Sequence, residues 1–255
     1  MRHKTIDEVT EIIKNSKYIV VLTGAGISTE SGIKDFRSKT GIYQMAPEYI
    51  LSIDYFYEKP KDFYEFALEN LYHPNAAPNL GHQVLAKWER EGRISRIITQ
   101  NIDALHQKAG SENVIEFHGT MTTASCMNCG QKYSTEEMVQ RYNKMEEFYV
   151  CDNCTSENKE DRYIKPDVVL FGDTGDWFTV EGFNTIINTI NQADCVLVLG
   201  TSLKVTPFST FPQYRNEDTP LIIINIGDTP YDYSPNTYVV QESIGETLRA
   251  IDERL

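Results

Sequence analysis

The chain has 255 residues, of which 40% are apolar, enough to bury the core of one large α/β domain with a smaller unit attached. Its 24 Lys and Arg residues against 37 Asp and Glu residues give a net charge of −13 at pH 7, which repels nucleic-acid phosphates and attracts lysine-rich protein segments. No apolar run approaches the roughly 18 to 20 residues of a membrane-spanning helix and residues 1–8 lack the apolar centre of a signal peptide, so we expect a cytoplasmic protein that contacts neither membranes nor nucleic acids.

The first elements predicted are a polar helix at residues 5–15 and a buried strand at 18–22 that leads straight into a glycine-containing loop. Residues 37–79 are rich in aromatic side chains, and prolines separate their short helical stretches, so we expect a helical module over the sheet. A helix expected at 80–91 ends at Gly92, and the strand after it starts a new strand–helix unit.

Residues 121–163 interrupt the alternation of strands and helices with four cysteines and polar loops, which indicates an insertion. From residue 164 onward the alternation of strands and helices returns, with helices expected at 179–192 and 244–253. This order of elements predicts an α/β fold with a parallel sheet.

Six apolar runs of the chain are each followed by a short polar or glycine-containing motif. In a parallel α/β sheet, ligands bind outside the carboxyl ends of the strands, so we expect these six motifs to converge on one crevice. The motifs are Thr23–Gly26, Thr99–Asp103, His118–Gly119, Gly172–Asp173, Gly200–Ser202 and Asn225.

Four cysteines form two Cys-x2-Cys knuckles, Cys126 with Cys129 and Cys151 with Cys154, separated by 21 residues. This spacing is typical of a zinc ion held by four thiolates. Four protein ligands leave no open position for water, so the predicted Zn²⁺, one per chain, is structural. The alternative is two disulfides or free thiols, which a reducing cytoplasm disfavours for the disulfides. Cys195 lies in an apolar strand and is expected to be a core residue.

The loop that contains Gly24 and Gly26 follows a strand, so its backbone N–H groups can cradle a pyrophosphate. A dehydrogenase fingerprint would have a third glycine where Thr29 stands and an acidic residue about 20 positions further on, so an ordinary dehydrogenase is disfavoured. The alternative for the two glycines is a tight strand-to-helix turn. Arg37 offers a guanidinium fork for a phosphate or a carboxylate.

Taken together, these motifs resemble those of the sirtuin family of NAD-dependent protein lysine deacylases. The resemblance rests on residues 24–37, 99–106, 115–119, 165–173, 200–203 and 224–225 and on the paired cysteine knuckles, and it runs in order from about residue 5 to 250. It implies that NAD and an acyl-lysine peptide meet in a cleft between a Rossmann-like domain and a smaller domain. The implied boundaries are 1–36, 80–120 and 164–255 for the NAD-binding domain, 37–79 for the helical module and 121–163 for the zinc-binding module.

The resemblance also implies roles for individual residues. His118 matches the general base, and Asn101 the side chain that orients a ribose hydroxyl or water. The residues expected to bind the cofactor are Gly24, Ala25, Gly26, Ser28, Thr29, Phe36, Arg37, Gln100, Asn101, Ile102, Asp103, His118, Gly200, Thr201, Ser202, Asn225 and Ile244. Those expected to pair with the substrate backbone as an added strand are Val168, Val169, Leu170, Phe171, Gly172 and Asp173.

In the implied reaction, the acyl-lysine carbonyl oxygen attacks the anomeric carbon of the nicotinamide ribose, nicotinamide leaves and an alkylimidate forms. His118 then deprotonates a ribose hydroxyl, a step that suits a histidine. The products are lysine, nicotinamide and O-acyl-ADP-ribose. Two alternatives stay open: a mono-ADP-ribosyltransferase or NAD glycohydrolase, and a non-catalytic NAD-sensing module.

The chain departs from the usual family pattern at Lys34 and Asp173, in the longer polar link at residues 155–163 and in the sequence around Trp177. Lys34 stands where the family usually has proline, and Asp173 replaces the more common glutamate at the substrate edge. No arginine lies between Phe63 and Tyr72, so the Tyr-x-x-Arg pair of the family branch that prefers acidic acyl groups is missing and a desuccinylase is not expected. The sequence does not indicate the protein substrate, the preferred acyl chain or the oligomeric state.

Overall fold

A computed structural model describes residues 5–255; residues 1–4, part of the predicted large domain, lie outside the described residues. Its larger sheet has six strands in the order β3-β2-β1-β7-β8-β9, and every neighbouring pair runs parallel. The first strand is entirely buried, as a continuous run of Ile, Val and Leu predicts for a sheet covered on both faces. The strands are β1 (Ile19–Thr23), β2 (Ile94–Thr99), β3 (Val114–Glu116), β7 (Cys195–Leu199), β8 (Leu221–Ile224) and β9 (Thr237–Val240).

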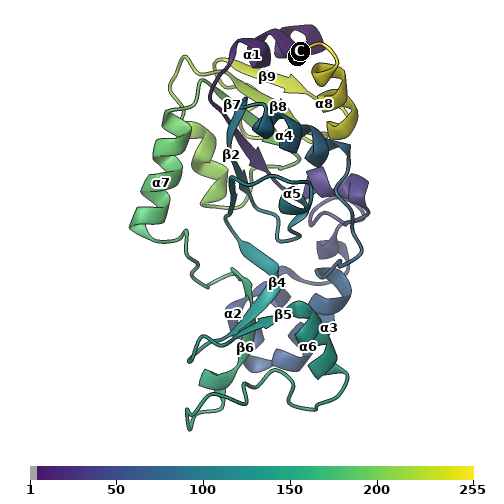
Figure 1. Cartoon of the computed structure of the whole chain (residues 1–255), viewed down its shortest axis with the longest axis vertical. Coiled ribbons are helices and arrows are strands. Elements are labelled where there is room, and N and C mark those ends of the chain that lie inside the picture. The colour runs from purple at the N-terminus through teal and green to yellow at the C-terminus, as the bar shows by residue number, and fades with distance from the viewer. Residues whose placement is uncertain (1–4) are drawn as a thin grey trace.

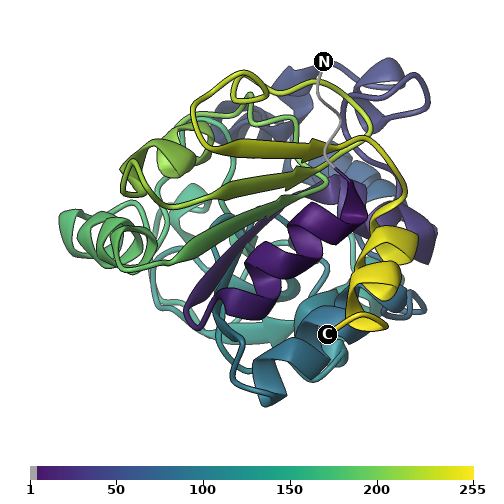
Figure 2. The same cartoon turned by 90° about the horizontal axis from the view of Figure 1, so that it is seen from above.

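Helices cover both faces of this sheet (Figures 1 and 2). One face packs against α1 (Ile6–Asn15), α4 (Leu80–Arg90) and α8 (Ile244–Asp252), and the other against α7 (Val180–Asn191) and the 3₁₀ helix η5 (Phe208–Tyr214). The parallel α/β fold predicted from the sequence is therefore confirmed. None of the helices within residues 5–255 is long and apolar enough to cross a membrane.

A second, three-stranded antiparallel sheet lies at the other end of the molecule, in the order β5-β4-β6 (Figure 1). Helices α2, α3 and α6 pack around it over a separate aromatic core, in which Phe56, Phe63, Tyr64 and Phe148 meet edge to face. The elements here are 3₁₀ helices η2 (Ile42–Gln44), η3 (Glu48–Leu51) and η4 (Glu160–Arg162), helices α2 (Ile53–Glu58), α3 (Pro60–Asn70) and α6 (Thr135–Tyr142), and strands β4 (Gly119–Cys126), β5 (Lys132–Ser134) and β6 (Ile164–Val168).

The sequence prediction was wrong about one strand and missed three others, β4, β5 and β9. The run Val168–Phe171 was expected to be a strand of the parallel sheet, but the strand is β6, which ends at Val168 and pairs antiparallel with β4. In β6, buried residues alternate with half-buried ones, the pattern of a strand covered on one face, and the run 168–171 only begins where that strand stops. Of the missed strands, β9 is a four-residue edge strand, too short to give a clear periodicity.

Candidate active site

A cavity of about 1070 Å³ lies between the two sheets, and all six motifs that were predicted to converge contribute residues to its wall. Five of them follow parallel strands, whereas the sixth, Gly172–Asp173, arrives from the small antiparallel sheet. The convergence is therefore correct, although not every contributor stands at the carboxyl end of a parallel strand.

Nearly all the predicted site residues line this cavity; Gly24 is the exception and lies just behind the wall. The lining includes Ala25, Gly26, Ser28, Thr29, Phe36, Arg37, Gln100, Asn101, Ile102, Asp103, His118, Gly200, Thr201, Ser202, Asn225 and Ile244, together with Val168–Asp173.

The loops after β1 and β7 pack backbone against backbone. Gly26 N–H donates to the Gly200 carbonyl at 2.8 Å, and a Cβ on Gly26 would lie 2.7 Å from the Gly200 Cα. Behind them, a Cβ on Gly24 would lie 2.6 Å from the Thr201 Cβ. These contacts explain the glycines: they let two loops approach closely enough to form a smooth backbone cradle at the carboxyl edge of the sheet.

A buried polar cluster forms the floor of the cavity. The Ser28 hydroxyl donates to the Asp103 carboxylate at 2.6 Å and accepts from the Asn101 amide at 3.1 Å. Asn101 is only 7% exposed, and its own backbone N–H donates to the Thr99 hydroxyl. Each side chain is thus held in one orientation by a partner, which is how a site fixes the position of a ligand in advance.

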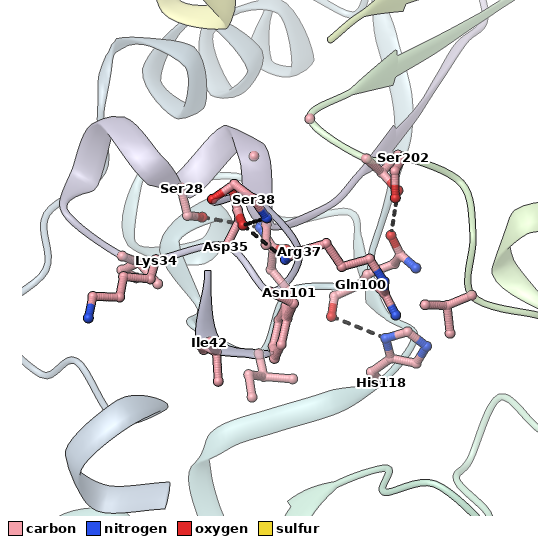
Figure 3. Close-up of a pocket in the computed structure, with 18 of the residues that line it drawn as sticks. Ser28, Lys34, Asp35, Arg37, Ser38, Ile42, Gln100, Asn101, His118 and Ser202 are labelled. Carbon is pink, nitrogen blue, oxygen red and sulfur yellow. Dashed lines mark hydrogen bonds between the residues drawn. The ribbon is translucent and has the colours of Figure 1, made fainter. Parts of the chain in front are cut away.

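His118 stands where β3 gives way to β4, with its ring beside the backbone of Gln100 (Figure 3). Nδ1 lies 3.3 Å from the Gln100 carbonyl oxygen. A carbonyl only accepts, so Nδ1 carries the proton and Nε2 keeps its lone pair. Burial lowers the pKa of His118 to about 4, so the ring is neutral at pH 7. The turn after it requires glycine, because a Cβ on Gly119 (φ 75°) would collide with the Asp167 carbonyl.

Arg37 lines the cavity (Figure 3), where its guanidinium lies 3.1 Å from the Glu48 carboxylate and 5.3 Å from the centre of the Tyr43 ring. The ion pair with Glu48 is half exposed and contributes little energy, so the guanidinium remains available to an anionic ligand.

The cysteine cluster lies in the smaller unit, away from the cavity. The sulfur atoms of Cys126, Cys129 and Cys151 lie within 4.8 Å of one another, and Cys129 Sγ is 3.8 Å from Cys151 Sγ. A tetrahedral Zn²⁺ with Zn–S bonds of about 2.3 Å holds its sulfurs about 3.8 Å apart, so these donors fit the metal. The fourth predicted ligand, Cys154, lies beside the cluster and accepts a hydrogen bond from Asn128 at 3.2 Å. None of the five cysteines forms a disulfide.

Comparison with known proteins decides the family. The model of the Sir2 family matches residues 24–207. The chain belongs to the Sir2 family. The sirtuin resemblance of the sequence is thereby confirmed.

Relatives of this family member are similar over nearly its whole length. One is the NAD-dependent protein deacetylase 2 of Caldanaerobacter subterraneus subsp. tengcongensis, 41% identical over 96% of this chain and 93% of that protein. Another is the NAD-dependent protein deacetylase of Thermotoga maritima, 39% identical over 88% of each. Among solved structures, a Sir2–p53 peptide–NAD⁺ complex (TM-score 0.85, 34% identity) and a Sir2 bound to an acetylated peptide (TM-score 0.84, 34% identity) each match 98% of both chains.

Several residues that line the cavity of this Sir2 family member were not predicted from the sequence. Lys204–Thr206 follow the predicted motif Gly200–Ser202 after one residue, Leu203, so extending that motif was the available signal. Others come from the helical module, whose apolar side chains carry no motif that separates a cavity wall from a core. They include Ile42, Tyr43, Leu51 and Leu71.

Two further histidines lie beneath the site. His82 on α4 and His106 on α5 (Leu105–Lys108) are buried, with ring centroids 4.9 Å apart. His106 Nε2 lies 2.9 Å from the Thr23 hydroxyl, which in turn donates to the Thr99 hydroxyl at 2.8 Å. Burial lowers the pKa of His82 to about 4 and that of His106 to about 3, the latter helped by repulsion between the two rings. Both rings are therefore neutral packing elements under the loop that carries Asn101.

Proposed function

We propose that this chain is an NAD-dependent protein lysine deacylase, most simply a deacetylase, that converts acyl-lysine, NAD and one water to lysine, nicotinamide and O-acyl-ADP-ribose. The observation that carries the proposal is the neutral His118, whose free Nε2 shares one cavity with the glycine cradle and the substrate segment. Support comes from relatives named NAD-dependent protein deacetylases at 39% and 41% identity.

NAD supplies the ribose that accepts the acyl group. The cradle at Gly26 and Gly200 leaves room for its pyrophosphate, and Arg37 offers a charge for the same group. We assign the nicotinamide end to the cluster of Ser28, Asn101 and Asp103, whose amide and carboxylate groups suit a carboxamide and a ribose. The adenosine end is assigned to Thr201, Ser202, Asn225 and Ile244.

His118 acts as the base. Its Nε2 takes the proton of a ribose hydroxyl, and the Nδ1–H bond to the Gln100 carbonyl stabilises the resulting imidazolium. In the cavity described here, burial holds the pKa of His118 low. An anionic pyrophosphate in the same cavity would raise that pKa toward neutrality, which strengthens the base when the cofactor is bound.

The segment Val168–Asp173 offers a docking edge for the substrate. Val169 N–H donates to the His118 carbonyl, and Phe171 N–H donates to the Leu51 carbonyl. Within residues 5–255, no hydrogen bond is made by the Val169 carbonyl or the Leu170 N–H. These two groups belong to one trans peptide unit and point to opposite edges, so an extended peptide on one edge can accept from the Leu170 N–H as an added strand, which needs little sequence specificity.

The test is a reaction of the protein with NAD and peptides carrying acetyl-, longer acyl- or succinyl-lysine, followed by mass spectrometry. Equal amounts of nicotinamide, deacylated peptide and O-acyl-ADP-ribose support the deacylase. Nicotinamide without deacylated peptide would instead indicate an ADP-ribosyltransferase or NAD glycohydrolase, and no nicotinamide with any peptide would indicate an NAD-sensing module.

Replacing His118 tests the role of the base. His118→Ala should reduce deacylation by at least 10²-fold, because general-base catalysis contributes about 10²–10⁴-fold, while NAD binding measured by calorimetry stays within a few-fold of the natural protein. Undiminished turnover in this variant would contradict the assignment.

We also propose that Cys126, Cys129, Cys151 and Cys154 hold one structural Zn²⁺. The support is the tetrahedral spacing of the first three sulfurs and the position of the fourth beside them. The metal would bind the two knuckles together, which stabilises a segment with little apolar material of its own.

A further inference from the structure

A buried ion pair closes the segment that we propose as the substrate edge. Lys165 Nζ lies 3.0 Å from Asp173 Oδ2, and each side chain is only 15% exposed. The same ammonium donates to the backbone carbonyls of Val168 at 2.7 Å and Pro166 at 3.0 Å. The ammonium thus donates to two carbonyls and forms an ion pair with the carboxylate, although Asp173 Oδ2 itself accepts no hydrogen bond within the described residues.

The position of this ion pair matters more than its strength. Val168 begins the segment and Asp173 ends it, so one ammonium ties the two ends of the run together. At the far end, the Asp173 N–H donates to the Leu170 carbonyl, and its other carboxylate oxygen accepts from Thr174 N–H at 2.7 Å. Gly172, at φ 82°, supplies the tight bend that this closure requires.

Resting on the proposed function, we propose that the Lys165–Asp173 ion pair is a positioning device that holds the segment, with its unpaired Leu170 N–H, in the geometry that receives the substrate peptide. Lys165 lies below the segment and is absent from the cavity wall, whereas Asp173 lines it. Lys165 thus acts through the segment rather than by touching the peptide. Without the ion pair, the segment must be ordered at the moment of binding, and that ordering weakens peptide affinity.

The same geometry gives a reason for aspartate at this position. The shorter side chain directs its carboxylate back onto Lys165, which leaves the docking edge to backbone groups alone. The site accordingly reads an extended acyl-lysine peptide through its main chain, and we expect it to tolerate varied residues beside the acyl-lysine.

The test measures binding of an acetyl-lysine peptide directly, by calorimetry, to the whole protein and to Lys165→Met, Asp173→Asn and the double variant. Each single variant should weaken the peptide Kd by about tenfold, within the range of coupling between contacting groups. The double variant should bind no more weakly than either single variant, because all three remove the same ion pair. The Kd for NAD should change by less than about twofold, because the cradle lies on the other sheet.

The matched control is Lys159→Met, which removes an exposed ion pair with Glu147 on the same small unit and should leave the peptide Kd unchanged. Thermal unfolding of each variant identifies any loss of folding, and Lys165→Arg, which keeps the charge, should restore most of the affinity.

Two results would overturn the inference. One is an unchanged peptide Kd in both single variants. The other is single effects that multiply in the double variant, which would mean that Asp173 contacts the peptide independently of Lys165. Peptide binding without deacylation by the natural protein would overturn the proposed function alone, whereas no peptide binding by the natural protein would overturn both.

Discussion

Acid should destabilise this protein through the buried pair His82 and His106. Their pKa values, about 4 and about 3, lie below the ordinary 6.5 because burial penalises the charged ring. As the pH falls below 6.5, the unfolded chain takes up protons that the folded chain does not, so unfolding becomes more favourable until the pH approaches the folded values. Between pH 7 and pH 5, each ring then contributes a loss of about 2 kcal/mol in the free energy of unfolding.

A comparison of the natural protein with His106→Gln isolates this contribution. Urea unfolding at pH 7, 6 and 5 gives the free energy of unfolding at each pH. The variant should be less stable at pH 7, since it loses a packed ring and the contact with Thr23. It should nevertheless lose about 2 kcal/mol less between pH 7 and pH 5, because one proton-binding site has gone from the unfolded chain. Carboxylates and the cysteine cluster respond to acid in both proteins alike, so an equal loss in the two would refute the reasoning.

Three further outcomes are expected. Metal analysis of the purified protein should find about one zinc per chain, and a chelator should lower its thermal midpoint, as loss of a structural zinc does; much less than one zinc would contradict the cysteine assignment. Gly26→Ala should weaken NAD binding at least tenfold in calorimetry, because its Cβ meets the Gly200 backbone at 2.7 Å, which has no room to move; an unchanged Kd would argue against the cradle. Ser28→Ala should raise the KM for NAD several-fold in steady-state assays, because Asn101 and Asp103 lose the hydroxyl that orients both, and an unchanged KM would separate that cluster from the cofactor.

The parallel sheet was predictable because its central strands are continuous apolar runs, each followed by a polar or glycine-containing motif. Strand β1 is buried over its whole length, and burial on both faces leaves no alternative pattern in such a sequence. Strand β6 was not predictable in the same way. Its inward residues alternate with Lys165 and Asp167, and the longer apolar run that follows belongs to a connecting segment.

The site was predictable to the extent that its functional residues lie in short sequence motifs. His118, Asn101 and the glycine cradle belong to such motifs, and the structure gathers them in one cavity. Contacts between side chains that are distant in sequence could not be predicted from any motif. The sequence placed Lys165 in a motif but could not show that its ammonium folds back onto Asp173, because that depends on the bend at Gly172.

The aromatic core of the small unit can form only late in the synthesis of the chain. Its helices α2 and α3 leave the ribosome long before β4 and β6, the strands that they cover. The Tyr64 hydroxyl, for example, donates to the carbonyl of Ile164, 100 residues later. At roughly 5–20 residues per second of synthesis, that aromatic surface stays uncovered for about 5 to 20 s. We expect the nascent chain to need a chaperone, or to aggregate, during this interval, and zinc to enter only after Cys154 has emerged.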